Sequence, residues 1–333
     1  MTLWFGTNPR RDRQQGVALL IVLVLLASLS VIALAMTQTM RTSTARARSA
    51  EALDQIRWYA LGAEVLAKGV IETQWQAEPA RDTREEDWLR APVRFPIDNG
   101  LIEAAITDDT RCFNLNSLVT REDDALVENP DALERLELML AQLGFDQVAQ
   151  AAIARGITDW IDTDAAPGIN GSEDADYARL STPYRTGNTL LADMSELRAL
   201  MWMSPELYQA VKPYVCVHPE TNPSPINVNL LTPADAPLVY ATLGGILEPH
   251  EVEALINDIP AEGFATIDQF WGLPVFSGRD LPDGAGDSFR LYSGWLRLKT
   301  NVNYNQAFIL QESLLEVGNN GAVSVVARKM GPE

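Results

Sequence analysis

The strongest pattern in the chain is an apolar run near its N-terminus, from Val17 to Met36. No charged residue occurs between Val17 and Met40, and the run would form a helix about 30 Å long, which matches the hydrocarbon core of a bilayer. Arginines lie on both sides of it, so charge hardly fixes its orientation. A secretory signal peptide has the same order of basic and apolar residues, and Ala33-Leu34-Ala35 supplies a small-residue cleavage motif. Both an anchor and a signal peptide therefore fit the local pattern.

The residues beyond this run favour a helix that continues. Residues 37–75 contain no proline, and apolar side chains recur there at the three-four spacing of an amphipathic helix. We therefore predict one helix from about Val17 to Trp75, roughly 90 Å long. Its first half would lie in lipid and its second half would pack on a folded domain. The spaced apolar positions are Leu53, Ile56, Ala60, Ala63, Ala67 and Val70.

Strand-like segments occur at both ends of the remaining chain. Residues 101–107 alternate loosely between apolar and polar positions, whereas Glu78–Asp98 is polar, contains three prolines and is predicted to be a loop. Near the C-terminus, residues 287–300, 304–317 and 322–329 form three strand-like runs separated by turns rich in Asn or Gly. We therefore expect an antiparallel sheet beside the long helix.

The central residues, 113–285, carry helical spacing and capping residues, which predict an all-α domain inserted into the sheet. A weak internal repeat divides it into two halves, because Phe113-Asn114-Leu115-Asn116 recurs as Ile226-Asn227-Val228-Asn229 and helical segments follow each copy. Asparagine side chains in such turns commonly cap neighbouring backbone groups. The fold class is thus α+β, with a long N-terminal helix, an antiparallel sheet and a helical insert.

Charge and cysteine content narrow the function. Forty-five acidic and 26 basic residues give a net charge of −19, which repels nucleic-acid phosphate and anionic lipid and suits cations. His218 and His250 have no motif that links them to Ser or Cys, and no nucleophile elbow or phosphate loop occurs, so we expect no enzyme. Cys112 and Cys216 predict one disulfide; a reactive thiol is the alternative, but the two cysteines lack a Cys-x-x-Cys spacing.

An acidic cluster in the central region is a candidate cation site. The spacing of its carboxylates partly matches an EF-hand loop, but Ala166 and Pro167 stand where that loop needs a ligand and a glycine. A calcium loop of another geometry and a solvated acidic loop both remain open, since crowded carboxylates repel one another unless a cation lies between them. The candidate ligands are Asp159, Asp162, Asp164, Glu173, Asp174 and Asp176.

The N-terminus resembles the leader of type IV pilins and pseudopilins, in which a short basic segment ends in glycine and an apolar helix follows at once. The resemblance implies that a prepilin peptidase cleaves after Gly16 and methylates Val17. Most pilins carry Glu five residues into the mature chain, where this chain has Ile21. That Glu neutralises the α-ammonium group of the subunit above, because an unpaired charge in lipid is costly. A subunit without it is expected only at the tip of a filament.

The downstream motifs resemble those of one family, the minor pseudopilin K of type II secretion systems. They occur in the order FNLNSLV, DWIDTD, GSEDADYARL, PYRTGN, SELRAL and INVNLLTP. The resemblance implies a subunit that initiates and caps a short pseudopilus with minor pseudopilins I, J and H. It also implies calcium in the helical insert, a single pass through the bacterial inner membrane, and a periplasmic C-terminal domain that could meet exoproteins or the outer-membrane secretin.

These patterns divide the chain into five parts. We predict a leader (1–16), a transmembrane and assembly helix (17–40), the first part of a pilin-like domain (41–112), the helical insert (113–285) and the C-terminal strands (286–333).

A rival function comes from the second half of the insert, because residues 226–258 resemble a helix-hairpin-helix, a unit that often holds DNA. A membrane-anchored periplasmic binding protein, such as a DNA receptor outside any filament, is therefore the alternative. No Lys or Arg occurs between Pro213 and Gly278, so we expect no nucleic-acid binding.

Overall fold

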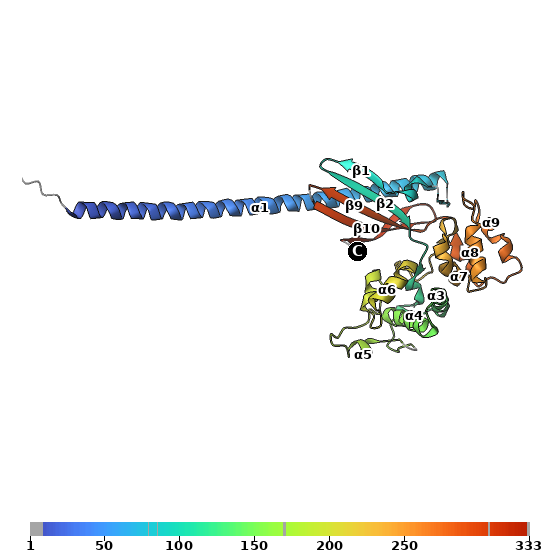
Figure 1. Ribbon diagram of the computed structural model, residues 1–333. Coiled ribbons are helices and arrows are strands. Elements are labelled where there is room, and N and C mark those ends of the chain that lie inside the picture. The colour runs from blue at the N-terminus through green and yellow to red at the C-terminus, as the bar shows by residue number, and fades with distance from the viewer. Residues whose placement is uncertain (1–8, 79, 85, 169–170, 306, 332–333) are drawn as a thin grey trace, which may run out of the picture.

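The computed structural model describes residues 9–78, 80–84, 86–168, 171–305 and 307–331. Helix α1 (Pro9–Ala77) is continuous over its 69 residues, in keeping with the absence of an interior proline, which would remove a backbone hydrogen bond and break the helix. Figure 1 shows its N-terminal half extending away from the molecule and its C-terminal half lying along the sheet. The predicted single helix is confirmed.

The sheet has five antiparallel strands in the order β1-β2-β9-β10-β11. Strands β2 and β9 are neighbours although the whole helical insert separates them in sequence, and Ile102 faces Val302 across the pair. The predicted loop at 78–98 is wrong, because this segment contains helix α2 (Asp87–Arg90) and strand β1. The strands are β1 (Val93–Ile97), β2 (Gly100–Asp108), β9 (Trp295–Tyr304), β10 (Ala307–Val317) and β11 (Val323–Met330).

A narrow stripe of α1 packs on one face of the sheet. Three of its members are alanines, which let the helix axis approach the strands closely. Leu53 and Val70 were expected in this stripe, but each is 46% exposed. The line of buried positions winds around the helix axis and ends at Ile71, so Val70 lies outside it. The stripe consists of Ile56, Ala60, Ala63, Ala67 and Ile71, and it contacts Ile102, Ile106, Leu298 and Val302.

A buried carboxylate fastens the C-terminal strands to this helix. The Glu64 side chain on α1 is 5% exposed and accepts two hydrogen bonds of 2.8 Å from the Arg328 guanidinium of β11. Ser313 on β10 donates a third at 2.9 Å. Burial opposes ionisation of Glu64, but the bonds from Arg328 and Ser313 outweigh it and hold the pKa of this carboxyl below its usual value.

The insert consists of two lobes that share one apolar core (Figure 1). Helices α3 (Pro130–Gln142), α4 (Gln147–Ile161), α5 (Asp174–Tyr177) and α6 (Pro205–Val211) form the first lobe, and α7 (Ala236–Thr242), α8 (Pro249–Asn257) and α9 (Ile267–Trp271) form the second. Short 3-10 helices span Leu115–Leu118, Met194–Ala199, Lys212–Tyr214, Val228–Leu230, Pro233–Asp235, Pro274–Phe276 and Ala285–Ser288.

The insert is mainly helical but also contains three short strand pairs, which the all-α expectation missed. Strand β3 (Phe113–Asn114) pairs with β6 (Val215–Cys216), β4 (Val119–Glu122) with β5 (Ala125–Glu128), and β7 (Ile226–Asn227) with β8 (Phe289–Arg290). The β3–β6 and β7–β8 pairs join segments far apart in sequence, so only the folded topology reveals them.

The sequence repeat corresponds to a repeated side-chain clamp. The second asparagine of the first motif, Asn116, donates to Leu191 O at 3.0 Å and accepts from Leu191 N at 2.8 Å. The matching Asn229 donates to Phe264 O at 3.3 Å and accepts from Phe264 N at 2.7 Å. Each motif thus holds a distant backbone segment as a strand partner would.

Replacing Asn116 with alanine is expected to lower the free energy of unfolding by about 2–4 kcal/mol, because it leaves buried backbone groups of Leu191 and His218 without partners. Denaturant titration checks this result. The matched variant Asn303→Ala alters an exposed asparagine of β9 and is expected to change stability by less than about 0.5 kcal/mol. Equal effects of the two substitutions would contradict the clamp.

Candidate functional sites

The first candidate site is the protruding part of α1. Every residue from Val17 to Glu51 is exposed, and the stretch that begins at Val17 has a mean hydropathy of 3.1 over its most apolar 18 residues. By length and composition this helix is able to cross a membrane. Gly16 and Val17 lie inside α1, whereas residues 1–8 of the predicted leader lie outside the described residues. Ile21 is 55% exposed, so the side chain at the expected Glu position is apolar and faces outward.

The second candidate site is the acidic loop that follows α4. Oxygen atoms of Asp162, Asp164 and Glu173 all lie within 4.8 Å of one another. One Asp162 oxygen and both Glu173 oxygens are buried, and none has a hydrogen-bond partner among the described residues. Buried carboxylate oxygens without partners are costly. The structure therefore brings three of the six predicted ligands together in a state that favours a cation.

The other three acidic side chains accept hydrogen bonds within the protein, as Asp164 also does from the Ala166 N–H at 2.7 Å. Asp159 accepts from the Gly168 N–H at 3.2 Å, and Asp174 accepts from the Thr186 N–H and hydroxyl at 2.9 and 2.8 Å. Asp176 accepts from Arg179 at 2.6 Å. These bonds shape the loop around the cluster.

The pKa values of three acids in this loop are raised, and that of a fourth is lowered. Burial, and then repulsion from Asp164 and Glu173, raises the pKa of Asp162 to about 7. Burial and the nearby Asp159 raise the pKa of Glu173 to about 7, and burial raises the pKa of Asp159 to about 6. Asp174 differs, because its bonds from Thr186 lower its pKa. A nearby positive charge would therefore stabilise the ionised forms of Asp162, Glu173 and Asp159 most.

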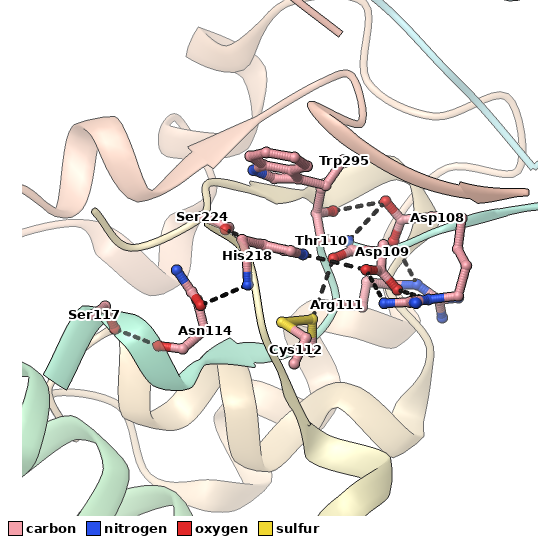
Figure 2. The surroundings of a disulfide bond; sticks show 12 residues. Asp108, Asp109, Thr110, Arg111, Cys112, Asn114, Ser117, His218, Ser224 and Trp295 are labelled. Carbon is pink, nitrogen blue, oxygen red and sulfur yellow. Dashed lines mark hydrogen bonds and ion pairs between the residues drawn. A yellow bond between two sulfur atoms is a disulfide. The ribbon is translucent and has the colours of Figure 1, made fainter. Parts of the chain in front are cut away.

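The third candidate site is the junction between sheet and insert, where Cys112 and Cys216 form a disulfide with their Cα atoms 5.6 Å apart (Figure 2). The bond reinforces the parallel pairing of β3 with β6. Sequence alone left a reactive thiol open, and the structure pairs both sulfurs. A His218 ring nitrogen lies within 4.8 Å of both sulfur atoms, but bonded sulfurs offer no thiolate to a metal.

A buried polar network beside this disulfide was missed from the sequence. His218 is fully buried, its Nδ1 is 2.6 Å from Ser224 Oγ and its Nε2 is 3.2 Å from Asp109 Oδ2, as Figure 2 shows. The ring stacks on Trp295 at 4.6 Å. Arg297 completes the network with a 2.6 Å bond to Asp109. Only the short His218–Ser224 spacing could have indicated it, because Asp109 is over one hundred residues away.

The protonation of this network follows from the charge of Asp109. Burial opposes its ionisation, but the hydrogen bond from His218 and the charge of Arg297 lower its pKa. An ionised carboxylate only accepts hydrogen bonds, so we assign the Nε2 proton of His218 to this contact and the Ser224 hydroxyl as donor to Nδ1. The contacts follow the order of a Ser-His-Asp triad, but a fully buried imidazole has no room for a substrate. The geometry supports a structural role that joins the sheet to both lobes.

The helix-hairpin-helix prediction corresponds to α7 and α8. Gly244 and Gly245 connect them with φ values of +62° and +69°, which glycine adopts readily. Residues 226–258 of the hairpin contain no Lys or Arg to meet a phosphate, and Arg279, which contacts the hairpin, is already paired with Glu251. This feature gives no support to the DNA-receptor alternative.

The fold and these sites together define a class: a protein with a long apolar N-terminal helix, a pilin-like frame and a large helical insert. The sequence profile of "Type II secretion system (T2SS), protein K" matches residues 111–220 and 226–289. The chain therefore belongs to the type II secretion system protein K family. The members of this family are minor pseudopilins of that system.

Individual relatives agree with this assignment. The type II secretion system protein K of Pectobacterium carotovorum subsp. carotovorum is 34% identical over 96% of this chain and 98% of that protein. The Klebsiella pneumoniae protein of the same name is 35% identical over 79% of this chain and 82% of its own. A similar solved chain occurs in the crystal structure of the GspK-GspI-GspJ complex from enterotoxigenic Escherichia coli. The two structures match with a TM-score of 0.73 and 28% sequence identity, over 86% of this chain and 100% of that chain.

Proposed function

We propose that this chain is the tip subunit of a type II secretion pseudopilus, where it initiates and caps assembly to support protein export. The observation that carries the proposal is the apolar Ile21 on an exposed helix, because a subunit without a carboxylate there cannot neutralise the α-ammonium of a subunit above it. The large insert beside the sheet (Figure 1) supports an end position, where no neighbour above competes for space.

The partners follow from the same proposal. The similar solved chain is part of a complex with GspI and GspJ, which supports minor pseudopilins I and J as neighbours of this chain. We propose minor pseudopilin H as a further partner. We propose cleavage by the prepilin peptidase after Gly16, methylation of Val17, and a single pass through the inner membrane with residues beyond 40 in the periplasm. Exoproteins and the secretin are proposed contacts of the insert (113–285).

We propose calcium as the cation of the acidic loop. Asp162, Asp164 and Glu173 fit the requirement for hard oxygen ligands, and the unpartnered buried oxygens of Asp162 and Glu173 are the observation that supports it. Bound calcium would supply the positive charge that the three carboxylates lack. Asp159 and Asp174 would act through the loop conformation that they hold.

The tip position predicts a single labelled end. Pseudopili that carry an epitope on the insert of this chain are expected to bind antibody-gold at one end in electron micrographs, because only the last subunit can lack the carboxylate. Label along the filament, or its absence from filaments, would contradict the proposal, and the latter would favour a periplasmic binding protein. Mass spectrometry of the mature N-terminal peptide is the control: methylated Val17 is expected, and a start after Ala35 would mean a cleaved signal peptide.

A further inference from the structure

A cleft of about 800 Å³ lies between the outer face of the sheet and the first lobe of the insert. Residues of β9, β10 and β11 form one wall, and the 3-10 helix Met194–Ala199 with α6 forms the other. The volume lies within the range of about 300–1,000 Å³ that is usual for ligand sites. The tip assignment leaves this cleft without a role.

The cleft is cationic in a protein that is strongly acidic. Among the described residues that line it, seven are basic and five are acidic. Each of the five carboxylates already pairs with a lining arginine or lysine. One of these pairs crosses the cleft, because Lys329 on β11 lies 2.9 Å from Asp193 at the start of the 3-10 helix. Arg328 also pairs with Glu64, which lies outside the lining, so the excess positive charge of the cleft rests on Arg198, and this charge selects anions.

Arg198 is the cation best placed for a ligand. It is exposed, it lines the cleft, and no carboxylate lies within ion-pair distance of it among the described residues. Its guanidinium lies 4.6 Å from the ring centroid of buried Tyr208. Stacking fixes the plane of the guanidinium in advance, which favours recognition of a planar carboxylate. Arg328, by contrast, is already neutralised by Glu64.

The form of the cleft favours an extended chain. Strand β11 is the last strand of its sheet, so the backbone groups along its outer edge have no strand partner among the described residues, and Ala327–Lys329 line the cleft. Such an edge accepts an added strand. Leu314, Val215 and Val217 supply apolar lining for intervening side chains. A free small anion would use the charge alone and leave these features unfilled.

We propose that this cleft binds an extended acidic peptide segment of another protein. Its carboxylates pair with Arg198 and compete with Asp193 for Lys329, and its backbone runs beside β11. The inference goes beyond the tip assignment and stands or falls independently of it, because it requires only the folded periplasmic part of the chain.

The test measures anisotropy of a fluorescein-labelled peptide of alternating Thr and Glu with the full-length protein in detergent micelles at fixed calcium. Saturable binding is expected. Arg198→Ala should weaken it about tenfold or more, as loss of a charge-assisted bond implies. Asp193→Asn should strengthen it several-fold, because it frees Lys329, while the asparagine retains the cap that Asp193 provides to Ser195 N. Opposite signs from two surface substitutions would not follow from altered folding.

The matched control is Arg121→Ala, which removes an exposed arginine of β4 outside the cleft and is expected to leave binding unchanged. The proposal is overturned if no saturable binding occurs, if a Thr-Lys peptide binds equally well, or if Arg198→Ala and Arg121→Ala behave alike. Citrate that binds as tightly as the peptide would also overturn it, since the cleft would then be a small-anion site only.

Discussion

Removing the disulfide, in the double variant Cys112→Ala/Cys216→Ala, is expected to lower the free energy of unfolding by about 4–5 kcal/mol. The two cysteines are 104 residues apart, so the bond greatly restricts the unfolded chain. In the folded state the disulfide links the start of β3 to β6. These two strands contain only two residues each and pair weakly on their own. Guanidinium titration of the full-length protein checks the value.

The loss should be local as well as global. The first lobe lies inside the loop that the disulfide closes, so hydrogen exchange is expected to accelerate most in α3, α4 and α6 and least in β9 and β10. A reducing agent should reproduce the effect in the wild type and do nothing to the double variant. A change below about 1 kcal/mol, or uniform acceleration across the sheet, would show that packing and the His218 network suffice without the bond.

Removing calcium is expected to lower the melting temperature of the full-length protein by about 5–10 °C. Calcium at about one hundred times its dissociation constant contributes roughly 2.7 kcal/mol, and each kcal/mol shifts the melting temperature by about 2–4 °C in a domain of this size. Differential scanning calorimetry with EDTA and then with excess calcium measures the shift. The double variant Asp162→Asn/Glu173→Gln should respond to neither addition, whereas Glu134→Gln, an exposed acid on α3, should respond as the wild type.

The metal-free protein should also depend on pH in a defined direction. Burial and neighbouring carboxylates raise the folded-state pKa values of Asp162 and Glu173 to about 7, from ordinary values of 3.8 and 4.5, so below pH 7 the folded state holds protons that the unfolded state releases. Stability is therefore expected to fall as pH rises from the ordinary carboxylate range to about 7 and then to level off. Calcium should remove this dependence, and identical profiles with and without calcium would rule out the site.

The elements that repeat a short pattern could be predicted from the sequence. The unbroken α1 and strands β10 and β11 follow from local spacing. The bounds of the strand expected at 287–300 are wrong, because a 3-10 helix and β8 precede β9, and residues 301–303, expected as a turn, belong to β9. Strand β1 could not be predicted, because Pro96 within it and Pro92 just before it indicate a loop. It forms because it is an edge strand, where the missing N–H of Pro96 breaks no ladder across the sheet.

The sites divide in the same way. Composition indicates the acidic loop, but backbone conformation decides that Asp174 meets Thr186 while Asp162 and Glu173 remain unpartnered. The contacts of His218 and the cleft beside Arg198 depend on segments that only the tertiary fold brings together. Sequence patterns therefore reached the family and the loop, whereas the network and the cleft required coordinates.

The disulfide also has a mechanical consequence. Cys112 lies just beyond β2, a strand hydrogen-bonded on both sides, and its partner Cys216 lies at the far end of the first lobe. A pull on that lobe therefore passes through a covalent bond into β2 and is resisted in shear by the whole sheet and the helix behind it. Without the bond, the same tension would peel open the two-residue pairing of β3 with β6. In the tip position proposed above, this subunit would thus transmit force to its first lobe without unfolding it.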